Sequence, residues 1–570
     1  MELRPSAHID TFARDHLPPA EQWPAFLLDL PGPPYPDRLN CGAELLDRTV
    51  ERYGADRVAV RAATGEVWTY GELRAHVDRI AHTLTGTLGV VPGNRVLLRG
   101  ASSPWLAACW LAVMKAGAVA VTVLAAHRAR ELATVCELAR IRHALCDIRC
   151  ADDLAKAGVP GLRTTYYGGD GPGDLLRLAA AAPASYEAVA TSADDVALIA
   201  FTSGTTGRPK GCMHFHRDVL AIADTFSAQV LRPRPEDVFA GSPPLGFTFG
   251  LGGLVVFPLR AGASALLADW GGPERLLTDI ARHRISVLFT APTAYRAMLA
   301  RLDGGAPDGG PYDISSLRRC VSAGENLPAG TWHAWHRATG LRIINGIGAT
   351  ELLHIFISAA DDAIRPGTTG VPVPGFEARV VEVADVDGNG DADAGAGLRP
   401  VPDGRPGLLA VRGPTGCRYL ADERQREYVR DGWNLTGDTY IRDADGYFRY
   451  VARADDMIIS AGYNIAGPEV EDALLRHPDV VEAAVTGRPD ERRGAVVVAH
   501  VVLRPGVPRT EETMAALREF TAAELAPYKC PREFVFLDAL PRTPTGKLQR
   551  YLLRDGTAQR GTWGASGALE

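Results

Sequence analysis

Residues Phe201–Gly211 read F-T-S-G-T-T-G-R-P-K-G and combine glycine, hydroxyl and basic residues in the manner of a phosphate-binding loop. The apolar run Val196–Ala200 before it predicts a buried strand, from which such loops commonly start. The backbone N–H groups and hydroxyls offered to phosphate oxygens belong to Thr202, Ser203, Gly204, Thr205, Thr206 and Gly207. Lys210 adds a cation, but Gly211 follows it where the kinase-type loop G-x-x-x-x-G-K-[ST] has the hydroxyl that holds magnesium. We therefore predict a phosphate loop of another kind, with a structural hairpin turn as the alternative.

Length and composition predict a soluble globular protein of two or more domains. The chain has 570 residues, 46% of them hydrophobic and 23% charged, and a net charge of -7, which gives no global reason to expect nucleic acid or an anionic membrane as a partner. The nine cysteines are scattered singly, as expected of reduced cytoplasmic thiols. The N-terminus lacks the apolar core of a signal peptide, and the apolar run Trp105–Leu124 is broken by Lys115 and Gly117. A cytoplasmic protein without a membrane span is therefore predicted.

Helical patterns alternate with short apolar runs, which predicts an α/β fold with largely parallel, buried strands. The predicted helices are Cys41–Tyr53, Tyr70–Leu88, Pro104–Ala116 and Leu276–Arg284. The predicted strands are Arg95–Arg99, Ala118–Leu124 and Val287–Phe289.

Two changes in composition indicate the domain organisation. Ala384–Pro406 is rich in Asp and Gly and mimics the start of a calcium loop, but Ala396 stands where a bidentate Glu is needed, so a solvated loop without metal is expected. A junction near Arg453–Asp456 precedes a compact α+β region. The elements predicted there are a helix at Pro468–Leu475, strands at Val480–Thr486 and Val496–Leu503, and a helix at Glu511–Leu525. We expect a large N-terminal α/β domain of several subdomains at 1–452, a small α+β domain at 453–556 and a disordered tail at 557–570.

Six segments, in this order, resemble the motifs of the acyl-adenylate-forming superfamily, which includes acyl- and aryl-CoA ligases, luciferases and peptide-synthetase adenylation domains. After T-S-G-T-T-G-R-P-K-G follow N-G-I-G-A-T-E at Asn345–Glu351, T-G-D at Thr436–Asp438, R-A-D-D at Arg453–Asp456, G-Y-N-I-A-G-P-E-V-E at Gly462–Glu471 and P-R-T-P-T-G-K at Pro541–Lys547. The resemblance spans about Asn40 to Arg554. It implies an enzyme that uses ATP, and a small mobile domain that turns about Asp455 between two half-reactions.

The resemblance assigns roles that suit the chemistry of each residue. A carboxylate that attacks the α-phosphate of ATP brings two anions together, so cations and hydrogen-bond donors must neutralise the approach. Lys547 is implied as the catalytic lysine of adenylation, with Thr350 at the α-phosphate and Glu351 as a ligand of Mg2+. Lys210 is then a helper on the β- and γ-phosphates.

The remaining nucleotide contacts are implied for three segments. Asp438 is the expected acceptor of both ribose hydroxyls, and Arg453 assists it. The segments implied for the nucleotide base and its surroundings comprise Gly324, Glu325, Asn326, Asn345, Gly346 and Ile347. Two departures from the family pattern affect nucleotide geometry and leave the reaction type intact: Ile347 stands where many members have an aromatic residue, and Ala452 replaces a glycine before the hinge arginine.

Other resemblances concern the acid and its acceptor. Gly462 and Tyr463, in G-Y-N-I, resemble the segment that borders the pantetheine tunnel of aryl-CoA ligases, which implies coenzyme A. T-E-L-L-H-I-F at 350–356 resembles benzoate-CoA ligases, and the N-terminal stretch with M-H-F-H-R-D-V-L at 213–220 resembles 2-aminobenzoate-CoA ligases. A flat apolar ring needs aromatic and aliphatic walls. The expected pocket residues are Phe247, Phe249, Gly348, His354 and Ile355.

Together these resemblances favour an aryl-acid CoA ligase, in which an aromatic carboxylate such as benzoate or 2-aminobenzoate and ATP give aroyl-AMP and pyrophosphate, and the thiol of coenzyme A then displaces AMP. The alternative is a stand-alone enzyme that loads a carrier protein's phosphopantetheine, because both acceptors present the same thiol. A catalytically silent relative is disfavoured because Lys547, Glu351 and Asp438 are present. The expected partners are the acid, ATP and coenzyme A, without nucleic acid or membrane; a homodimer is one oligomeric state we consider.

Overall fold

The computed structural model describes residues 3–30, 34–202, 209–269, 272–305, 310–383, 397–460, 463–490, 493–543 and 548–554. The expectations for Ser203–Gly207, the acidic loop 384–396, Gly462, Lys547 and the tail 557–570 concern residues outside this part of the chain.

The first sheet has six strands in the order β6-β5-β3-β4-β7-β8, and every strand except β8 runs parallel to its neighbours. Its strands are β3 (Arg95–Arg99), β4 (Val119–Val123), β5 (His143–Asp147), β6 (Arg163–Tyr167), β7 (Val196–Thr202) and β8 (Lys210–Phe215). β3 and β4 are buried along their whole length because α5 (Pro104–Lys115) packs on one face and α6 (Ala129–Leu138) on the other. Thr202 and Lys210 are antiparallel partners, so the predicted phosphate loop lies between the strands of a β-hairpin.

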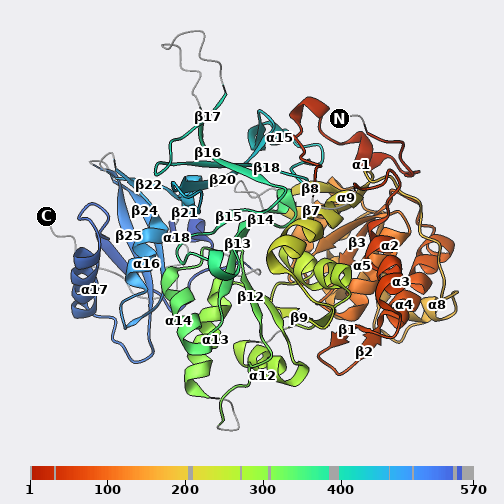
Figure 1. Ribbon diagram of the computed structural model, residues 1–570, viewed down its shortest axis with the longest axis horizontal. Coiled ribbons are helices and arrows are strands. Elements are labelled where there is room, and N and C mark those ends of the chain that lie inside the picture. Colours follow the sequence, from red (N-terminus) through yellow and green to blue (C-terminus); the bar gives the residue numbers. More distant parts are fainter. Residues whose placement is uncertain are drawn as a thin grey trace.

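The second sheet has nine strands in the order β15-β14-β13-β12-β11-β9-β10-β1-β2, with a parallel centre and antiparallel edges (Figure 1). Its strands are β1 (Val58–Ala62), β2 (Val67–Thr69), β9 (Val238–Gly241), β10 (Ser264–Leu267), β11 (Val287–Thr290), β12 (Arg319–Ser322), β13 (Ile343–Gly348), β14 (Ile355–Ser358) and β15 (Val371–Pro372). The carboxyl ends of β12 and β13 lie side by side, which places the segments after them at one edge of the sheet.

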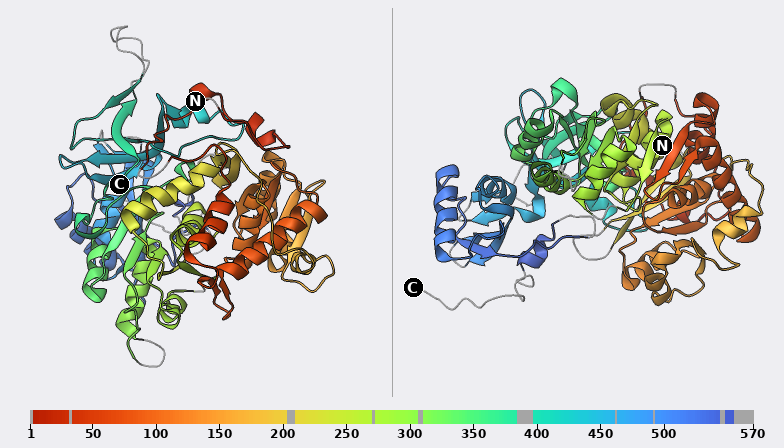
Figure 2. Two further views of the ribbon diagram at one scale, coloured as in Figure 1. Left: turned by 45° about the vertical axis from the view of Figure 1, so that its right-hand side comes forward. Right: turned by 90° about the horizontal axis from the view of Figure 1, so that it is seen from below.

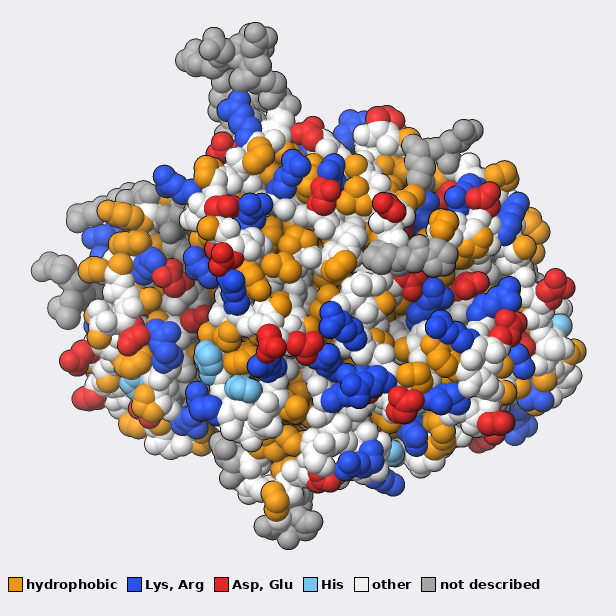
Figure 3. All heavy atoms as spheres, in the orientation of Figure 1, with side chains coloured by type: hydrophobic (Ala, Val, Ile, Leu, Met, Phe, Trp, Pro, Cys, Tyr) orange, Lys and Arg blue, Asp and Glu red, His pale blue; other side chains and the backbone are white. Residues whose placement is uncertain are grey.

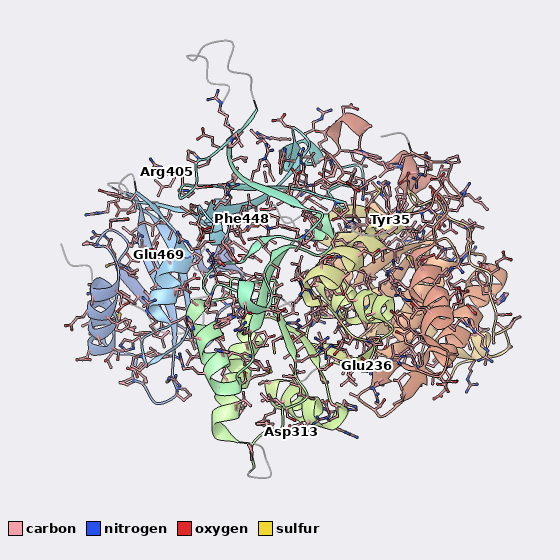
Figure 4. All side chains as sticks on the ribbon, viewed as in Figure 1. Tyr35, Glu236, Asp313, Arg405, Phe448 and Glu469 are labelled. Atoms are coloured by element: carbon pink, nitrogen blue, oxygen red, sulfur yellow. The ribbon has the colours of Figure 1, made fainter. Side chains whose placement is uncertain are left out.

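A third sheet is entirely antiparallel, and the prediction of largely parallel strands missed it. It comprises β16 (Glu377–Val383), β17 (Leu398–Pro400), β18 (Pro406–Arg412), β19 (Val429–Arg430), β20 (Trp433–Arg442) and β21 (Phe448–Arg453). Its strands are partly exposed and alternate in burial, whereas the parallel strands are continuous apolar runs, so the sequence signal is weaker here. Figure 4 shows Phe448 of β21 near the centre of the molecule.

The other helices of this large part are α1 (Phe12–Asp15), α2 (Cys41–Leu45), α3 (Asp47–Tyr53), α4 (Tyr70–His82), α7 (Ala151–Lys156), α8 (Leu175–Ala180), α9 (His216–Ile222), α10 (Thr248–Leu251), α11 (Phe257–Ala261), α12 (Pro273–His283), α13 (Pro292–Gly304), α14 (Ala329–Thr339) and α15 (Gln425–Tyr428). The helical prediction at Cys41–Tyr53 is confirmed except at Leu46, where the chain breaks into α2 and α3. α4 begins at a capping box formed by Thr69 and Glu72 and continues after His82 as a π-helix over Thr83–Thr87, so the helical stretch reaches the predicted end within one residue.

The C-terminal elements form a small unit at one end of the molecule (Figures 1 and 2). It contains the hairpin β22 (Ile458–Ser460) and β23 (Tyr463–Ile465), a sheet of β24 (Val480–Asp490), β25 (Gly494–Leu503) and β26 (Glu533–Phe536), and the helices α16 (Gly467–Leu474), α17 (Glu511–Glu524) and α18 (Arg550–Arg554). The predicted α+β elements of this region are confirmed within a few residues. They enclose a separate apolar core that includes Val470, Val485 and Leu517.

The surface carries both signs of charge, interspersed across the face shown in Figure 3. Among the described helices, none combines the length and the apolar character needed to cross a membrane.

Candidate active site

Glu351 lies at the centre of the candidate site, in the short 3-10 helix Thr350–Leu352 that follows β13. Its side chain is nearly buried, and its Oε1 accepts a hydrogen bond of 2.5 Å from the hydroxyl of Tyr419. The Nζ of Lys210 lies 4.0 Å from the same oxygen. Burial and the Glu351 carboxylate raise the pKa of Tyr419, so its hydroxyl keeps the proton that it donates. The structure thus brings together Lys210 and Glu351, which come from two different sequence motifs.

Lys210 is held by aromatic rings as well as by the carboxylate. Its Nζ lies 4.7 Å from the ring centroid of Tyr419 and 5.8 Å from that of Tyr428. The hydroxyl of Tyr428 is buried and makes no hydrogen bond within the described part of the chain. Burial raises the pKa of Tyr428, and the charges of Glu351 and Asp438 add to this effect. The sequence reasoning missed both tyrosines, because neither lies in a quoted motif.

A row of buried polar side chains holds the backbone of Thr350 in place. The Nε2 of His214 lies 2.8 Å from the carbonyl oxygen of Thr350. On its other side the ring faces Asp218, with Nδ1 3.8 Å from a carboxylate oxygen, and Asp218 is paired with Arg418. His214 and Asp218 belong to the stretch M-H-F-H-R-D-V-L, where the sequence showed only a resemblance; their role in holding Thr350 was not predicted.

Asp438 and Arg453 are cross-strand partners on β20 and β21. Arg453 Nη1 donates to Asp438 Oδ1 at 3.1 Å and to the carbonyl oxygen of Thr436 at 3.0 Å. The carboxylate is largely buried, while the arginine side chain is 40% exposed. The two residues predicted to serve the ribose are therefore neighbours.

The segment implied for adenine follows β12, beside the end of β13. Gly324 has φ +90°, and a Cβ added there would meet no atom within 4 Å, so this glycine combines a left-handed backbone with open space beside it. Asn326 is exposed. The side chain of Glu325 turns toward the small domain, where Oε1 accepts a hydrogen bond of 2.9 Å from Arg542. Asn345 on β13 donates from Nδ2 to the carbonyl oxygen of Thr368 at 3.2 Å.

His354 is buried in an aromatic cluster directly after the Glu351 turn. Its ring centroid lies 4.5 to 6.3 Å from the centroids of four phenylalanine rings, those of Phe226, Phe249, Phe257 and Phe289. Neither ring nitrogen makes a hydrogen bond of ordinary geometry within the described residues. Burial lowers the pKa of His354 to about 3, and the backbone of Phe249 offsets this only in part, so the imidazole is neutral. Two unpaired polar atoms in such a cluster require an explanation.

The backbone around His354 is tight. A Cβ added to Gly252 would lie 2.3 Å from His354 Cδ2, and one added to Gly348 would lie 2.8 Å from the His354 carbonyl oxygen. Leu353 has φ +69° and ψ -35°, close to a strained γ-turn that non-glycine residues rarely adopt. This turn carries the chain from the Glu351 cluster into the aromatic cluster. Ile355 and Phe249 are buried beside it, and Phe247 is partly buried at the start of α10.

Of the residues predicted in the small unit, Asp455 and Tyr463 belong to the described part of the chain. Asp455 belongs to the short 3-10 helix Ala454–Asp456 between β21 and β22. Tyr463 is 53% exposed, and its ring stacks on that of Tyr528 with centroids 4.4 Å apart. The structure therefore does not bring Tyr463 to the Glu351 cluster.

The fold and this geometry define a two-part α/β enzyme with a charged site beside an aromatic one, and comparison with known proteins identifies its family. Residues 46–419 match the family described as AMP-binding enzyme, and residues 469–547 match the AMP-binding enzyme C-terminal domain. The chain therefore belongs to the AMP-binding enzyme family, as the motifs predicted, and is an AMP-forming acid–thiol ligase.

Individual relatives cover nearly the whole chain. It is 33% identical to the benzoate-CoA ligase of Thauera aromatica over 525 residues, 91% of this chain and 96% of that protein. It is 33% identical to the anthranilate-CoA ligase of Pseudomonas aeruginosa, over 81% and 87% of the two chains. Among solved structures, the anthranilate CoA ligase AuaEII in complex with anthranoyl-AMP superposes with a TM-score of 0.83 at 32% identity, covering 92% of this chain and 98% of that chain.

Proposed function

We propose that this enzyme activates an aromatic carboxylic acid of the benzoate type with ATP and transfers the aroyl group to coenzyme A. The observation that carries the proposal is the change of environment between Glu351 and His354. Glu351 lies with Lys210 and Tyr419, whereas His354 lies among phenylalanine rings. A site with a charged part next to an aromatic part suits an acid whose carboxylate is attached to a flat apolar ring. The names of the relatives, benzoate and anthranilate among them, support the same class of acid.

In the first half-reaction the acid's carboxylate attacks the α-phosphate of ATP, and pyrophosphate leaves. Lys210 stabilises the β- and γ-phosphates, and Thr350 contacts the α-phosphate from a backbone that His214 holds in place. Lys547 neutralises the negative charge that builds up where the carboxylate approaches the α-phosphate. Asp438 accepts hydrogen bonds from the ribose hydroxyls, with Arg453 beside it. The base lies in the open space beside Gly324.

Glu351 is the residue that would hold a magnesium ion. Within the described part of the chain no cluster of three metal-binding side chains exists, so the ion's other ligands would be phosphate oxygens and water. A buried carboxylate with one oxygen occupied by Tyr419 still has lone pairs to offer, which fits a single-residue contribution. When bound, Mg2+ supplies neutralisation of the phosphate charge.

His354 provides the partner for a polar ring substituent. Its neutral imidazole has one donor and one acceptor nitrogen, neither with a hydrogen bond of ordinary geometry within the described residues, and an ortho-amino or ortho-hydroxy group buried without a partner would cost about 1–3 kcal/mol. The amino group of an acid such as 2-aminobenzoate could pair with a nitrogen of His354. The phenylalanine rings would then contact the unsubstituted edge of the acid's ring.

A panel of substituted benzoates, incubated with ATP and coenzyme A, tests the proposal. AMP release and the mass of the thioester product are measured for each acid. We expect aroyl-CoA from benzoate and from at least one polar-substituted benzoate. AMP without aroyl-CoA would favour a carrier protein as the acceptor, and turnover of aliphatic acids alone would refute the aryl assignment.

A further inference from the structure

The stretch that carries Lys547 is anchored at both ends by main-chain contacts. Arg542 and Leu548 form an isolated antiparallel bridge, and the backbone N–H of Gln549 donates to the carbonyl oxygen of Pro541 at 2.9 Å. The described residues on the two sides of this stretch therefore meet at Arg542.

The side chain of Arg542 connects this base to two carboxylates from different parts of the fold. Nη1 donates to Oε1 of Glu325 at 2.9 Å, and Nη2 donates to Oε2 of Glu482 at 3.1 Å. Glu325 follows β12 in the large domain, whereas Glu482 lies on β24 in the small one. The arginine side chain is only 24% exposed and that of Glu325 only 17%, so solvent weakens this contact less than it weakens a surface ion pair.

The arginines around Glu325 offset part of the cost of burying its carboxylate. Burial raises the pKa of Glu325, and the opposing effects come first from Arg542 and then from Arg296 on α13. Arg296 also faces Glu482 and Asp472 of the small domain, and burial raises the pKa of Asp472 to about 6. Each domain therefore contributes both an arginine and a carboxylate to the contact between Arg542 and Glu325.

On the hairpin β22–β23 of the same domain, Ile459 and Tyr463 are 60% and 53% exposed, whereas Arg542 contacts Glu325 of the large domain.

We propose that Arg542 is a positioning residue of the adenylation half-reaction, whose guanidinium holds the small domain against the adenine-side segment through Glu325. The inference rests on the proposed function in that Lys547 acts in adenylation. Arg542 itself does not touch the reacting atoms. Its contribution is to the placement of Lys547, so its loss affects only the step in which Lys547 acts.

The test separates the two half-reactions in the full-length enzyme. In Arg542→Ala we expect the kcat of acid-dependent ATP–pyrophosphate exchange to fall about tenfold or more, from the loss of hydrogen bonds to charged groups. Thioester formation from supplied aroyl-AMP and coenzyme A stays within about twofold of wild type, which also shows that the variant is folded. Arg542→Lys restores part of the exchange rate, because an ammonium replaces the charge but not the two-armed geometry.

Two further variants make the test specific. Arg509→Ala is the matched control, since Arg509 pairs with Asp538 on the same small domain without reaching the large one; it leaves both half-reactions unchanged. In a Glu325→Gln background, Arg542→Ala adds little further loss, because the two residues act through one contact.

Equal losses in both half-reactions, or additive losses in the double variant, would overturn the assignment of Arg542. Exchange is measured with whichever acid the wild-type enzyme activates. A failure of the aryl-acid assignment therefore appears in the wild type and leaves the comparison between variants intact.

Discussion

Replacing His354 with leucine is expected to change which benzoates the enzyme prefers. The leucine side chain is close to imidazole in volume and has no polar atom, so the variant removes the two unpaired ring nitrogens while keeping most of the packing. If those nitrogens pair with a substituent on the acid, polar-substituted benzoates lose a partner and benzoate loses nothing. The preference for 2-aminobenzoate over benzoate should therefore fall.

The size of the change follows from the cost of an unpaired buried polar group. That cost is about 1–3 kcal/mol, which corresponds to a fall of roughly five- to 150-fold in the ratio of kcat/KM for 2-aminobenzoate to kcat/KM for benzoate. Folding stability should change less. The lost edge contact with the Phe257 ring, 4.5 Å away, costs about 0.5–1.5 kcal/mol. Removal of two unsatisfied nitrogens offsets that loss.

The assay is steady-state AMP release with the two acids in parallel, and Phe257→Leu is the control. Phe257 lies against the same ring and is fully buried, but it contributes no polar atom. Its truncation should lower stability and leave the ratio of the two substrates unchanged. An unchanged ratio in His354→Leu, or an equal change in both variants, would refute the pairing of His354 with the substituent.

The remaining predictions concern the charged cluster, the ribose site and pH. Lys547→Ala should abolish acid-dependent pyrophosphate exchange and largely spare thioester formation from supplied aroyl-AMP; full exchange would contradict its assignment. Tyr419→Phe removes the 2.5 Å hydrogen bond to Glu351 and should lower the kcat of exchange about tenfold, measured at saturating ATP, with an unchanged rate as the contrary result. Asp438→Ala should raise KM for ATP by about tenfold or more without changing KM for the acid, whereas equal changes in both would count against a ribose contact. Because the pKa of His354 is depressed to about 3, the unfolded chain takes up a proton that the folded chain excludes, so stability present above about pH 6.5 is lost as pH falls, by about 2 kcal/mol at pH 5 for this one group. The urea midpoint of His354→Leu should accordingly depend less on pH between 7 and 5 than that of wild type, and an identical dependence would show that His354 titrates normally.

The parallel strands were the most predictable part of the fold. Arg95–Arg99 is a strand with the predicted bounds, and β4 begins one residue inside the predicted run, because strands covered on both faces must be continuously apolar. β16 and β18 are half-exposed, so their apolar residues do not stand out from surrounding loops. The break at Leu46 was not predictable from periodicity, because both halves keep their apolar residues on the buried side.

At the candidate site, the sequence motifs identified the residues proposed to contact the substrates. They did not identify the side chains that hold those residues in place. Glu351 and Asp438 were found because each stands in a short segment of recognisable sequence. Tyr419 and His214 act through contacts with residues more than 60 positions away, and the sequence contains no local sign of such contacts. The sequence likewise did not predict that the ring nitrogens of His354 lack partners, because a histidine in an apolar stretch is more often hydrogen-bonded.

The hairpin between β7 and β8 has a consequence for how phosphate charge is balanced. In a kinase-type loop the strand leads through the loop into a helix, whose N-terminal dipole supplies positive charge to the phosphates. Here the loop leads from Thr202 into an antiparallel strand that begins at Lys210, so no helix begins at its end. Side-chain cations must supply the missing charge. Lys210 is partly neutralised by Glu351 4.0 Å away, which leaves a need for a second cation. In the function proposed above that cation is Lys547, and the contact of Arg542 with Glu325 is a described feature that joins its domain to the large one.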